Sequence, residues 1–580
     1  MIKRLSQCIR EYKLASVLTP LLVSLEVVME VLIPFLMGKL IDDGINKADT
    51  SFVVKVGVLL VVLCVFSLFF GAAAGVTAAK ASAGFAKNLR HDMFHNVQSF
   101  SFANIDKFST AGLVTRLTTD VTNLQMSYQM IIRIAVRSPA MLLFSLVMAM
   151  SINSKISVIF LCVIPVLALG LGLVVKYAHP VFKRVFRTFD KLNNVVEENL
   201  RGIRVVKSFV REKEEEKKFK AVSDTIYSDT RKAENIIAFN SPMMQTATYT
   251  CILLIAWFSA NLIVSSGETE MTTGDLVSVL SYVMQILMNL MMLSMIFVML
   301  TMSKAAGERV CEVLDEKSDL TNPAEPLYEV ADGSIDFENV SFAYSQKSRN
   351  YCLKNVDLHI KSGETVGIIG ATGSSKTTLV QLIARLYDTT EGTVKVGGRD
   401  VREYDLDTLR NAVAMVLQKN VLFSGTIKEN LRWGKEDATD EEIFEVCRLS
   451  CADAFIRERE EGYDTFIEQG GTNVSGGQKQ RICIARSLLK SPKVLILDDS
   501  TSAVDTATDA MIRKAFREYI PETTKLIIAQ RISSIEDADK VIVLDDGGIS
   551  GFGTPAELLE SNEIYREVYF SQKKGGSENE

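Results

Sequence analysis

Six long apolar stretches dominate the first 301 residues of this chain. They cover approximately residues 16–38, 53–77, 131–152, 156–176, 238–265 and 274–301. A helix that crosses a membrane needs ~20 consecutive, mostly apolar residues, and each stretch reaches that length. The pattern therefore predicts an all-α transmembrane domain of six long helices.

The connections between these stretches alternate between short and long, and most of the positive charge lies in the long ones. The short connections at 153–155 and 266–273 carry almost none. One long connection contains Lys183, Arg184, Arg187, Lys191, Arg201, Arg204, Lys207 and Arg211. Because positive loops stay in the cytoplasm, we expect both long loops and both termini there. Mixed-charge sequence such as 212–220 predicts that the helices continue beyond the membrane.

The character of the sequence changes after the sixth stretch. We predict a transmembrane domain over 1–314, a linker over 315–334, a soluble α/β domain over 335–572 and a polar tail over 573–580. The linker is charged and contains Pro323 and Pro326. The first 13 residues are basic and amphipathic and lack a small-residue cleavage site. They predict an interfacial helix, not a removable signal peptide.

Composition narrows the possible functions. A net charge of −6 argues against a nucleic-acid partner. Nine scattered cysteines, several inside apolar runs, argue against a disulfide framework. Cys447 and Cys451 have helical spacing but no second ligand pair, so they are interpreted as ordinary helix residues and not as a metal site.

A phosphate-binding loop is the first motif of the soluble part. An apolar strand at 365–369 runs into a small-residue loop and then a helix. The loop and helix start comprise Gly370, Ala371, Thr372, Gly373, Ser374, Ser375, Lys376, Thr377 and Thr378. Backbone N–H groups and the helix N-terminus bind phosphate in such a loop, with Lys376 on the β- and γ-phosphates and Thr377 on Mg²⁺. Ser375 replaces the usual glycine, so we expect strain or crowding there.

A second anion-binding segment follows about 100 residues later. It comprises Val474, Ser475, Gly476, Gly477 and Gln478, followed by a helical sequence. With the phosphate loop, this segment makes the chain resemble an ABC transporter of the exporter type, a half-transporter with one membrane domain before one nucleotide-binding domain. The resemblance covers nearly the whole chain. It implies a P-loop ATPase domain of ABC type that uses ATP and Mg²⁺, with the phosphate loop as Walker A and Val474–Gln478 as the signature.

The resemblance also implies roles for individual residues. Tyr344 matches the aromatic residue that stacks on adenine, and Gln418 and Asp498 match ligands of Mg²⁺, the aspartate acting through water. Ser502, Ala503, Val504 and Asp505 match the D-loop, which crosses between two nucleotide domains. Glu468 matches a loop that senses the membrane helices, and 111–117 and 200–209 match two coupling regions.

Two positions depart from the family pattern at the catalytic centre. Asp499 stands where the family places a glutamate base, and Gln530 stands where it places a histidine that contacts the γ-phosphate. The four histidines all lie at or before His359, so no nearby histidine replaces Gln530. Aspartate is one methylene shorter, and glutamine lacks imidazole chemistry. The sequence thus predicts a site that binds ATP and hydrolyses it poorly.

The signature is nearly intact, because Val474 replaces leucine by another apolar residue. This asymmetry predicts a heterodimer in a bacterial cell membrane, in which a second half-transporter supplies the catalytic glutamate and histidine. The expected cargo is a small hydrophobic or amphipathic compound. A slow homodimeric exporter of lipid or peptide and an ATP-gated channel or regulator remain as alternatives.

Two groups inside the apolar stretches are candidates for a substrate cavity. Glu26 and Glu30 share one helix face and predict either a cation-attracting patch or a pair satisfied by a neighbouring helix. Met284, Met288, Met291 and Met295, continued by Met299 and Met302, form a stripe on one face of the last stretch. Such a stripe suits a promiscuous binding wall, but also helix packing or lipid contact.

Overall fold

The structure is a computed structural model that describes residues 1–344, 350–499 and 504–577. Within these ranges it leaves out the side chains of Val175, His179, Phe186, Asp190, Ser294, Phe297, Val298, Thr301, Met302 and residues 574–577. The chain divides into two compact units. The first contains Met1–Gln98 and Ser109–Glu316, and the second contains Ser99–Phe108 and Lys317–Glu580.

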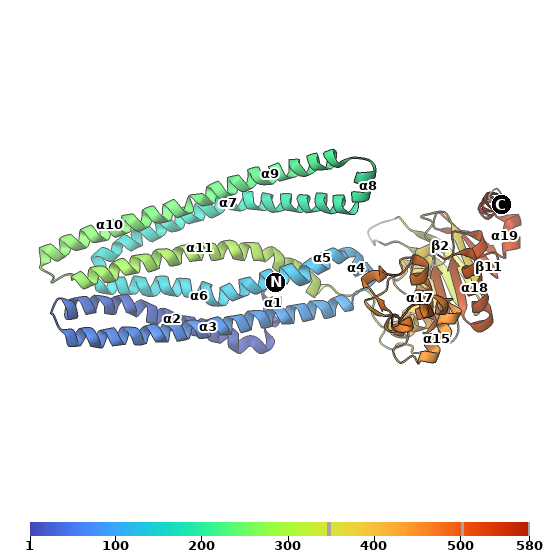
Figure 1. The fold of residues 1–580 in the computed structure, drawn as a ribbon, viewed down its shortest axis with the longest axis horizontal. Coiled ribbons are helices and arrows are strands. Elements are labelled where there is room, and N and C mark those ends of the chain that lie inside the picture. Colours follow the sequence, from blue (N-terminus) through green and yellow to red (C-terminus); the bar gives the residue numbers. More distant parts are fainter. Residues whose placement is uncertain (345–349, 500–503, 578–580) are drawn as a thin grey trace. The chain divides into compact units, whose positions relative to one another are not determined.

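The first unit is entirely helical (Figure 1). Six of its helical segments are long and apolar enough to cross a membrane, which confirms the predicted helical transmembrane domain. The long helices are α2 (Lys13–Lys39), α3 (Thr50–Gln98), α6 (Val121–Ile152), α7 (Ser154–Arg201), α9 (Glu212–Ala238), α10 (Asn240–Ser266) and α11 (Thr273–Asp315). Short elements connect them: α1 (Ile2–Gln7), η1 (Arg10–Tyr12), η2 (Leu40–Ile45), α5 (Thr110–Thr115), η3 (Arg116–Asp120) and α8 (Ile203–Ser208).

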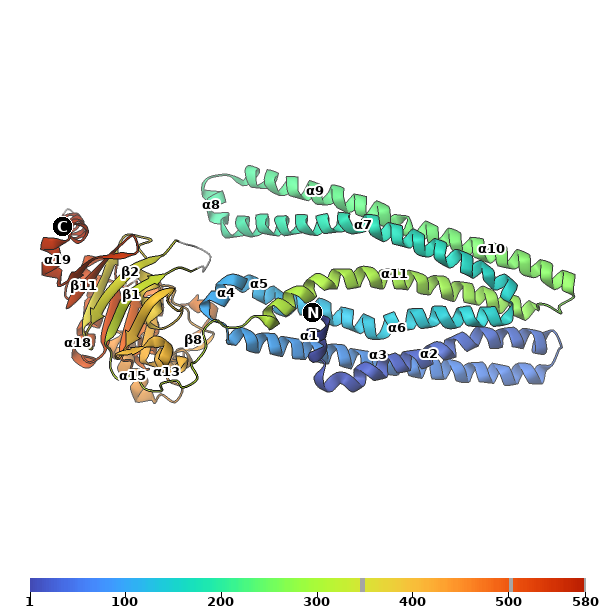
Figure 2. The same cartoon turned by 180° about the vertical axis from the view of Figure 1, so that it is seen from behind.

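Several helices extend well beyond the apolar stretches, as predicted. Helix α3 has 49 residues, whereas its apolar stretch covers only 53–77. Helices α7 and α9 lie side by side and are joined by α8, and α10 packs against both α7 and α11 (Figures 1 and 2). A shared core of apolar residues from α2, α6, α7, α10 and α11 holds the bundle together, with Phe160, Ile255 and Tyr282 almost fully buried.

The N-terminal segment is a short helix, α1, anchored by charged contacts to the bundle. The Arg4 guanidinium lies 3.1 Å from the carboxylate of Asp315, and Arg10 lies 2.8 Å from that of Asp92. These ion pairs attach the start of the chain to the ends of α11 and α3.

The second unit is built on two main sheets. One is a four-stranded sheet in the order β2-β1-β4-β5, with neighbouring strands antiparallel. Its strands are β1 (Ile335–Phe342), β2 (Leu353–Ile360), β4 (Glu391–Val396) and β5 (Arg399–Asp400). The other is a six-stranded sheet in the order β12-β11-β3-β10-β9-β6, parallel except for β12. Its strands are β3 (Thr365–Gly370), β6 (Val413–Val416), β9 (Val494–Asp498), β10 (Thr524–Ile528), β11 (Lys540–Asp545) and β12 (Gly548–Gly553). This arrangement confirms the predicted α/β domain.

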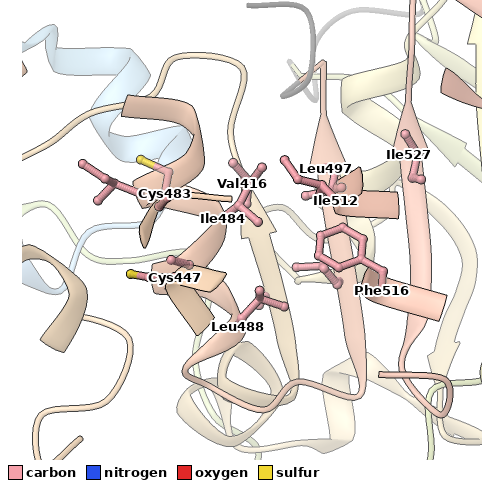
Figure 3. Close-up of a cluster of buried hydrophobic side chains, with 14 of the residues drawn as sticks. Val416, Cys447, Cys483, Ile484, Leu488, Leu497, Ile512, Phe516 and Ile527 are labelled. Atoms are coloured by element: carbon pink, nitrogen blue, oxygen red, sulfur yellow. The ribbon is translucent and has the colours of Figure 1, made fainter. Parts of the chain in front are cut away.

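Helices pack around the six-stranded sheet. They are α12 (Lys376–Ile383), α13 (Leu406–Ala412), α14 (Ile427–Arg432), α15 (Asp440–Leu449), α16 (Asp453–Arg457), α17 (Gly476–Leu488), α18 (Thr506–Tyr519), α19 (Pro555–Ser561) and α20 (Glu563–Ser577). A two-stranded ribbon pairs β7 (Gly425–Thr426) with β8 (Phe466–Ile467). Strands β9 and β10 are buried along their length because both faces of the sheet are covered. Figure 3 shows Leu497 of β9 and Ile527 of β10 beside Phe516 of α18.

The structure departs from the predicted domain boundaries at two places. The segment Ser99–Phe108, which contains helix α4 (Phe102–Phe108), groups with the nucleotide unit although it lies inside the range predicted as transmembrane. The predicted polar tail begins inside α20, which runs to Ser577. The buried ring of Tyr565 and the ion pair between Lys573 and Glu536, at 3.2 Å, hold that helix on the domain.

Candidate ATP-binding site

The phosphate loop connects the end of β3 to the start of α12. The Lys376 ammonium lies within the loop and donates hydrogen bonds to the carbonyl oxygens of Gly370, at 2.9 Å, and Ala371, at 2.8 Å. Burial lowers the pKa of Lys376, while the carboxylates of Asp498 and Asp499 act to raise it. A partly buried cation next to free N–H groups at a helix start is the chemistry that an anionic phosphate requires.

Ser375 occupies a backbone conformation that favours glycine. Its φ is +69° and its ψ is +26°, the left-handed region, where the Cβ of an L-residue is crowded. Its side chain makes no capping hydrogen bond to the helix. The loop therefore keeps the geometry of the usual glycine and holds a strained serine.

Replacing Ser375 with glycine is expected to stabilise the nucleotide-free protein by ~1 kcal/mol, because the strain of a left-handed serine is removed. The measurement is thermal unfolding of the purified transporter. The neighbouring Ser374 is a matched control, since it is not among the residues with positive φ. Ser374→Gly should lower the stability of the protein instead of raising it. A Ser375→Gly protein less stable than the parent would contradict the strain.

Two of the residues predicted to bind Mg²⁺, Thr377 and Asp498, come together at the end of β9. The Thr377 hydroxyl donates to Asp498 Oδ1 at 3.0 Å, and Asp498 is 2% exposed. Burial raises the pKa of Asp498, and the neighbouring Asp499 raises it further. This hydroxyl and this buried carboxylate are oxygen groups of the kind that Mg²⁺ prefers, and the Gln418 amide contacts Asp499, the next residue along the chain. The residues present thus fit the ion that accompanies ATP.

Asp499, Gln530 and Gln418 form one hydrogen-bonded group. The Gln530 amide donates to Asp499 Oδ2 at 2.7 Å, and the Gln418 amide approaches the same oxygen at 3.4 Å. Asp499 itself has a left-handed backbone, with φ of +48°. The two positions that depart from the family pattern are therefore in direct contact with each other.

Gln572 is a residue of this site that sequence reasoning missed. Its side-chain amide donates to the carbonyl oxygen of Gln530 at 2.9 Å and accepts from the N–H of Ile532 at 2.8 Å. Through this pair of bonds α20 fixes the loop that carries Gln530. Gln572 lies 42 positions away in sequence and belongs to no motif, so only the folded chain reveals the contact.

Tyr344 lies beside the phosphate loop, as its predicted contact with adenine requires. Its hydroxyl is 2.9 Å from that of Thr378 and donates to Gln381 at 3.2 Å. The residue remains 50% exposed, although the rings of Phe342 and Tyr387 pack edge-on against its own at 4.9 and 5.2 Å.

The signature segment forms the start of α17. Ser475 caps the helix: its hydroxyl accepts from the N–H of Gln478 at 3.3 Å, and its own N–H donates to the side chain of Gln478 at 3.1 Å. Ser475 and Gly476 are exposed, while Val474 is buried in the core. The helix N-terminus therefore faces outward and can accept an anion from another molecule.

The remaining predicted positions of the nucleotide domain have structural roles in this chain. Asp505 caps α18 by accepting from the N–H of Thr508 at 2.9 Å, and Val504 is buried. Ser502 and Ala503 lie outside the described residues. Glu468 is exposed and accepts from the hydroxyl of Thr472 at 2.6 Å.

The acidic pair of the first apolar stretch is bridged by one arginine on another helix. Arg137 of α6 contacts Glu26 Oε1 at 2.5 Å and Glu30 Oε2 at 2.7 Å. Glu26 is 6% exposed, and its second oxygen has no hydrogen-bond partner. The structure therefore favours the interpretation of a pair satisfied by a neighbouring helix over that of a cation-attracting patch.

The methionine stripe lies on the open face of α11. Met284, Met288, Met291 and Met295 are exposed, whereas Val279, Tyr282, Val283, Ile286, Leu287 and Leu290 pack into the bundle core. The side chain of Met302 lies outside the described residues. The four exposed methionines thus do not serve the packing of this bundle, and they remain available to cargo, lipid or a partner.

Six apolar helices in one chain with an α/β domain that carries a phosphate-loop sequence are typical of a membrane transport ATPase. Comparisons with known proteins specify the family. The sequence profile of the ABC transporter transmembrane region matches residues 17–291, and that of the ABC transporter ATP-binding domain matches 353–502. The chain is 36% identical to the ABC transporter ATP-binding protein YfiB of Bacillus subtilis, covering 97% of each chain. It is 33% identical to Rv1273c of Mycobacterium tuberculosis, covering 99% of this chain and 98% of that one. This chain therefore belongs to the ABC transporter family, with one transmembrane region and one ATP-binding domain in one polypeptide.

A solved structure shows the same fold. A bacterial Atm1-family ABC exporter with ATP bound superposes with a TM-score of 0.82 at 23% identity, covering 97% of this chain and 99% of that one. The chain thus has the fold of that exporter, and its transmembrane region is of the kind that lies in a membrane.

Proposed function

We propose that this chain is the ATP-retaining half of a heterodimeric ABC exporter. Its own composite site holds ATP and Mg²⁺ with little hydrolysis, and its signature completes the hydrolytic site of a different half-transporter. The observation that carries this proposal is the 2.7 Å hydrogen bond between Gln530 and Asp499. It joins the two altered catalytic positions into one unit and occupies an oxygen of Asp499, the carboxylate at the position of the expected base.

The chemistry of the retained site follows from its side chains. Lys376 and the N–H groups at the start of α12 bind the phosphates, and Tyr344 stacks on adenine. Mg²⁺, when bound with ATP, neutralises phosphate charge next to Thr377 and Asp498. Asp499 is one methylene shorter than glutamate, and a misplacement of about an ångström can lower a rate ~10²-fold. Gln530 binds by hydrogen bonds and cannot exchange a proton as imidazole does.

The signature supports the second part of the proposal. Ser475, Gly476 and the N-terminus of α17 are open, and a helix N-terminus stabilises the charge that develops on a transferred phosphoryl group. In a homodimer these intact groups would serve only impaired sites. In a heterodimer, a partner that carries the catalytic glutamate and histidine would form a hydrolytic site with these signature groups. The cargo that suits an exposed methionine stripe is hydrophobic or amphipathic. The positive charge of the long connections supports a cytoplasmic location of both termini, in a bacterial cell.

The test is a comparison of two catalytic substitutions in the co-purified pair. A glutamine at the partner's catalytic glutamate is expected to lower ATP turnover by ~10²-fold or more, because that base is lost. Asp499→Asn is expected to change it by no more than about twofold, since this site contributes little turnover. The measurement is steady-state ATPase activity in nanodiscs, with ATP binding of each variant as the control. Equal losses from the two substitutions would refute the proposed asymmetry.

A further inference from the structure

The C-terminal helix α20 reaches from the core of the nucleotide domain to the loop that carries Gln530. Its start is anchored in that core. Tyr565 is 1% exposed, and its N–H donates to Asn562 Oδ1 at 2.9 Å. The Asn562 amide in turn donates to the carbonyl oxygen of Ser550 in β12 at 3.1 Å. The beginning of α20 is therefore fixed to the six-stranded sheet, and the helix extends from this fixed point.

Farther along, α20 contacts the chain on both sides of a short helix, η7 (Ile532–Ser534). After η7, Glu536 pairs with Lys573 at 3.2 Å. Before it, the Gln572 amide donates to the carbonyl oxygen of Gln530 at 2.9 Å, and the Gln572 side-chain oxygen accepts from the N–H of Ile532 at 2.8 Å. One primary amide can do both because it carries a donor and an acceptor on the same planar group.

The backbone that Gln572 holds is the backbone that directs the Gln530 side chain. Up to Ala529, the loop is still attached to the sheet, since the Ala529 N–H donates to a carbonyl oxygen of β3 at 3.2 Å. Gln530 and Arg531 follow and are exposed. The two bonds of Gln572 hold this exposed stretch in place. They therefore determine where the Gln530 amide lies relative to Asp499, which it contacts at 2.7 Å.

We propose that Gln572 is a positioning residue that holds Gln530 at Asp499 and thereby sets how long ATP stays in this site. This inference rests on the proposed function, in which the site retains ATP. Gln530 stands where the family places the contact with the γ-phosphate. A loop held in one position preorganises that contact, so less ordering is needed to keep the nucleotide bound. Gln572 acts through the backbone of Gln530.

The experiment measures the release of ATP, labelled at its α-phosphate, from the co-purified pair during a chase with unlabelled ATP and Mg²⁺. The slow phase reports retained nucleotide, and its loss in Lys376→Ala assigns it to this chain's phosphate loop. Gln572→Met keeps the length of the side chain and removes both hydrogen bonds, so the slow phase should become about fivefold faster or more. Gln572→Glu keeps the acceptor for Ile532 and removes the donor for Gln530, and it should act in the same way. Ser571→Met, at the neighbouring exposed position of α20, should leave the rate unchanged.

A double variant separates positioning of Gln530 from a general loosening of α20. In Gln530→Ala the side chain that Gln572 positions is absent, so adding Gln572→Met should accelerate release by less than about twofold further. An equal effect of Gln572→Met in both backgrounds would overturn the inference, as would release at the parent rate from Gln572→Met or Gln572→Glu. A parent pair that shows no slow phase would instead overturn the proposed function, because ATP would not be retained at this site.

Discussion

Replacing Gly476 with aspartate is expected to lower ATP turnover of the assembled transporter by about 10²-fold or more, the range seen when an oxyanion-stabilising contact is lost. Gly476 is exposed at the first position of α17, where the helix N-terminus is directed outward. A carboxylate there places negative charge against the γ-phosphate bound on the partner's phosphate loop. The fold should be unharmed, because an acidic residue in the first turn of a helix is favourable.

The measurement is ATPase activity of the co-purified pair at saturating ATP. Gly476→Asn is the matched control, since asparagine has the shape of aspartate without its charge, and a much smaller loss is expected. Thermal unfolding of both variants establishes that the domain remains folded. If Gly476→Asp retained activity close to that of the parent, the signature of this chain would not contribute to the hydrolytic site.

Replacing Arg137 with leucine is expected to destabilise the membrane bundle by ~3–5 kcal/mol, the usual loss when one partner of a buried ion pair is removed. Arg137 joins α6 to α2 through both Glu26 and Glu30. Without the guanidinium, two carboxylates remain without a cation at a site where water is largely excluded. One oxygen of Glu26 already lacks a hydrogen-bond partner, and the oxygens that Arg137 contacts would then lack one too. The measurement is thermal unfolding of the purified transporter, supported by its yield in membranes.

Arg133 offers a matched control for this prediction. It lies one turn away on α6, is also half-buried, and forms no ion pair among the described residues. Arg133→Leu should therefore cost far less. A triple variant with Glu26→Gln, Glu30→Gln and Arg137→Leu should recover most of the lost stability, because no uncompensated charge remains. Equal stability of Arg137→Leu and Arg133→Leu would show that the contacts of Arg137 with Glu26 and Glu30 do not stabilise the bundle.

The sequence alone was sufficient to predict features that are formed by residues adjacent along the chain. The phosphate loop and the signature are contiguous, and each combines small residues with a helix start, so their backbone geometry follows from local sequence. The membrane-spanning helices could also be predicted from the sequence, because a membrane helix must satisfy its own backbone hydrogen bonds and carry apolar side chains on its surface. The altered residues Asp499 and Gln530 were visible for the same reason, as they end two recognisable apolar strands.

The sequence could not predict contacts between residues that lie far apart along the chain. Glu26 and Glu30 allowed two interpretations until Arg137, 111 positions from Glu26, was seen between them. The same limit applies to Gln572 of α20, whose contact with the loop that carries Gln530 no motif predicts. A polar side chain does not specify which of many donors or acceptors it meets, and only the packing of helices and sheets brings one within hydrogen-bond distance. The sequence by itself determined the two-part architecture and predicted the chemistry of the ATP site, since both depend on local pattern. Tertiary structure alone decided which charges are paired, where α4 belongs and what fixes the loop of Gln530, because those contacts depend on distance in space and not along the chain.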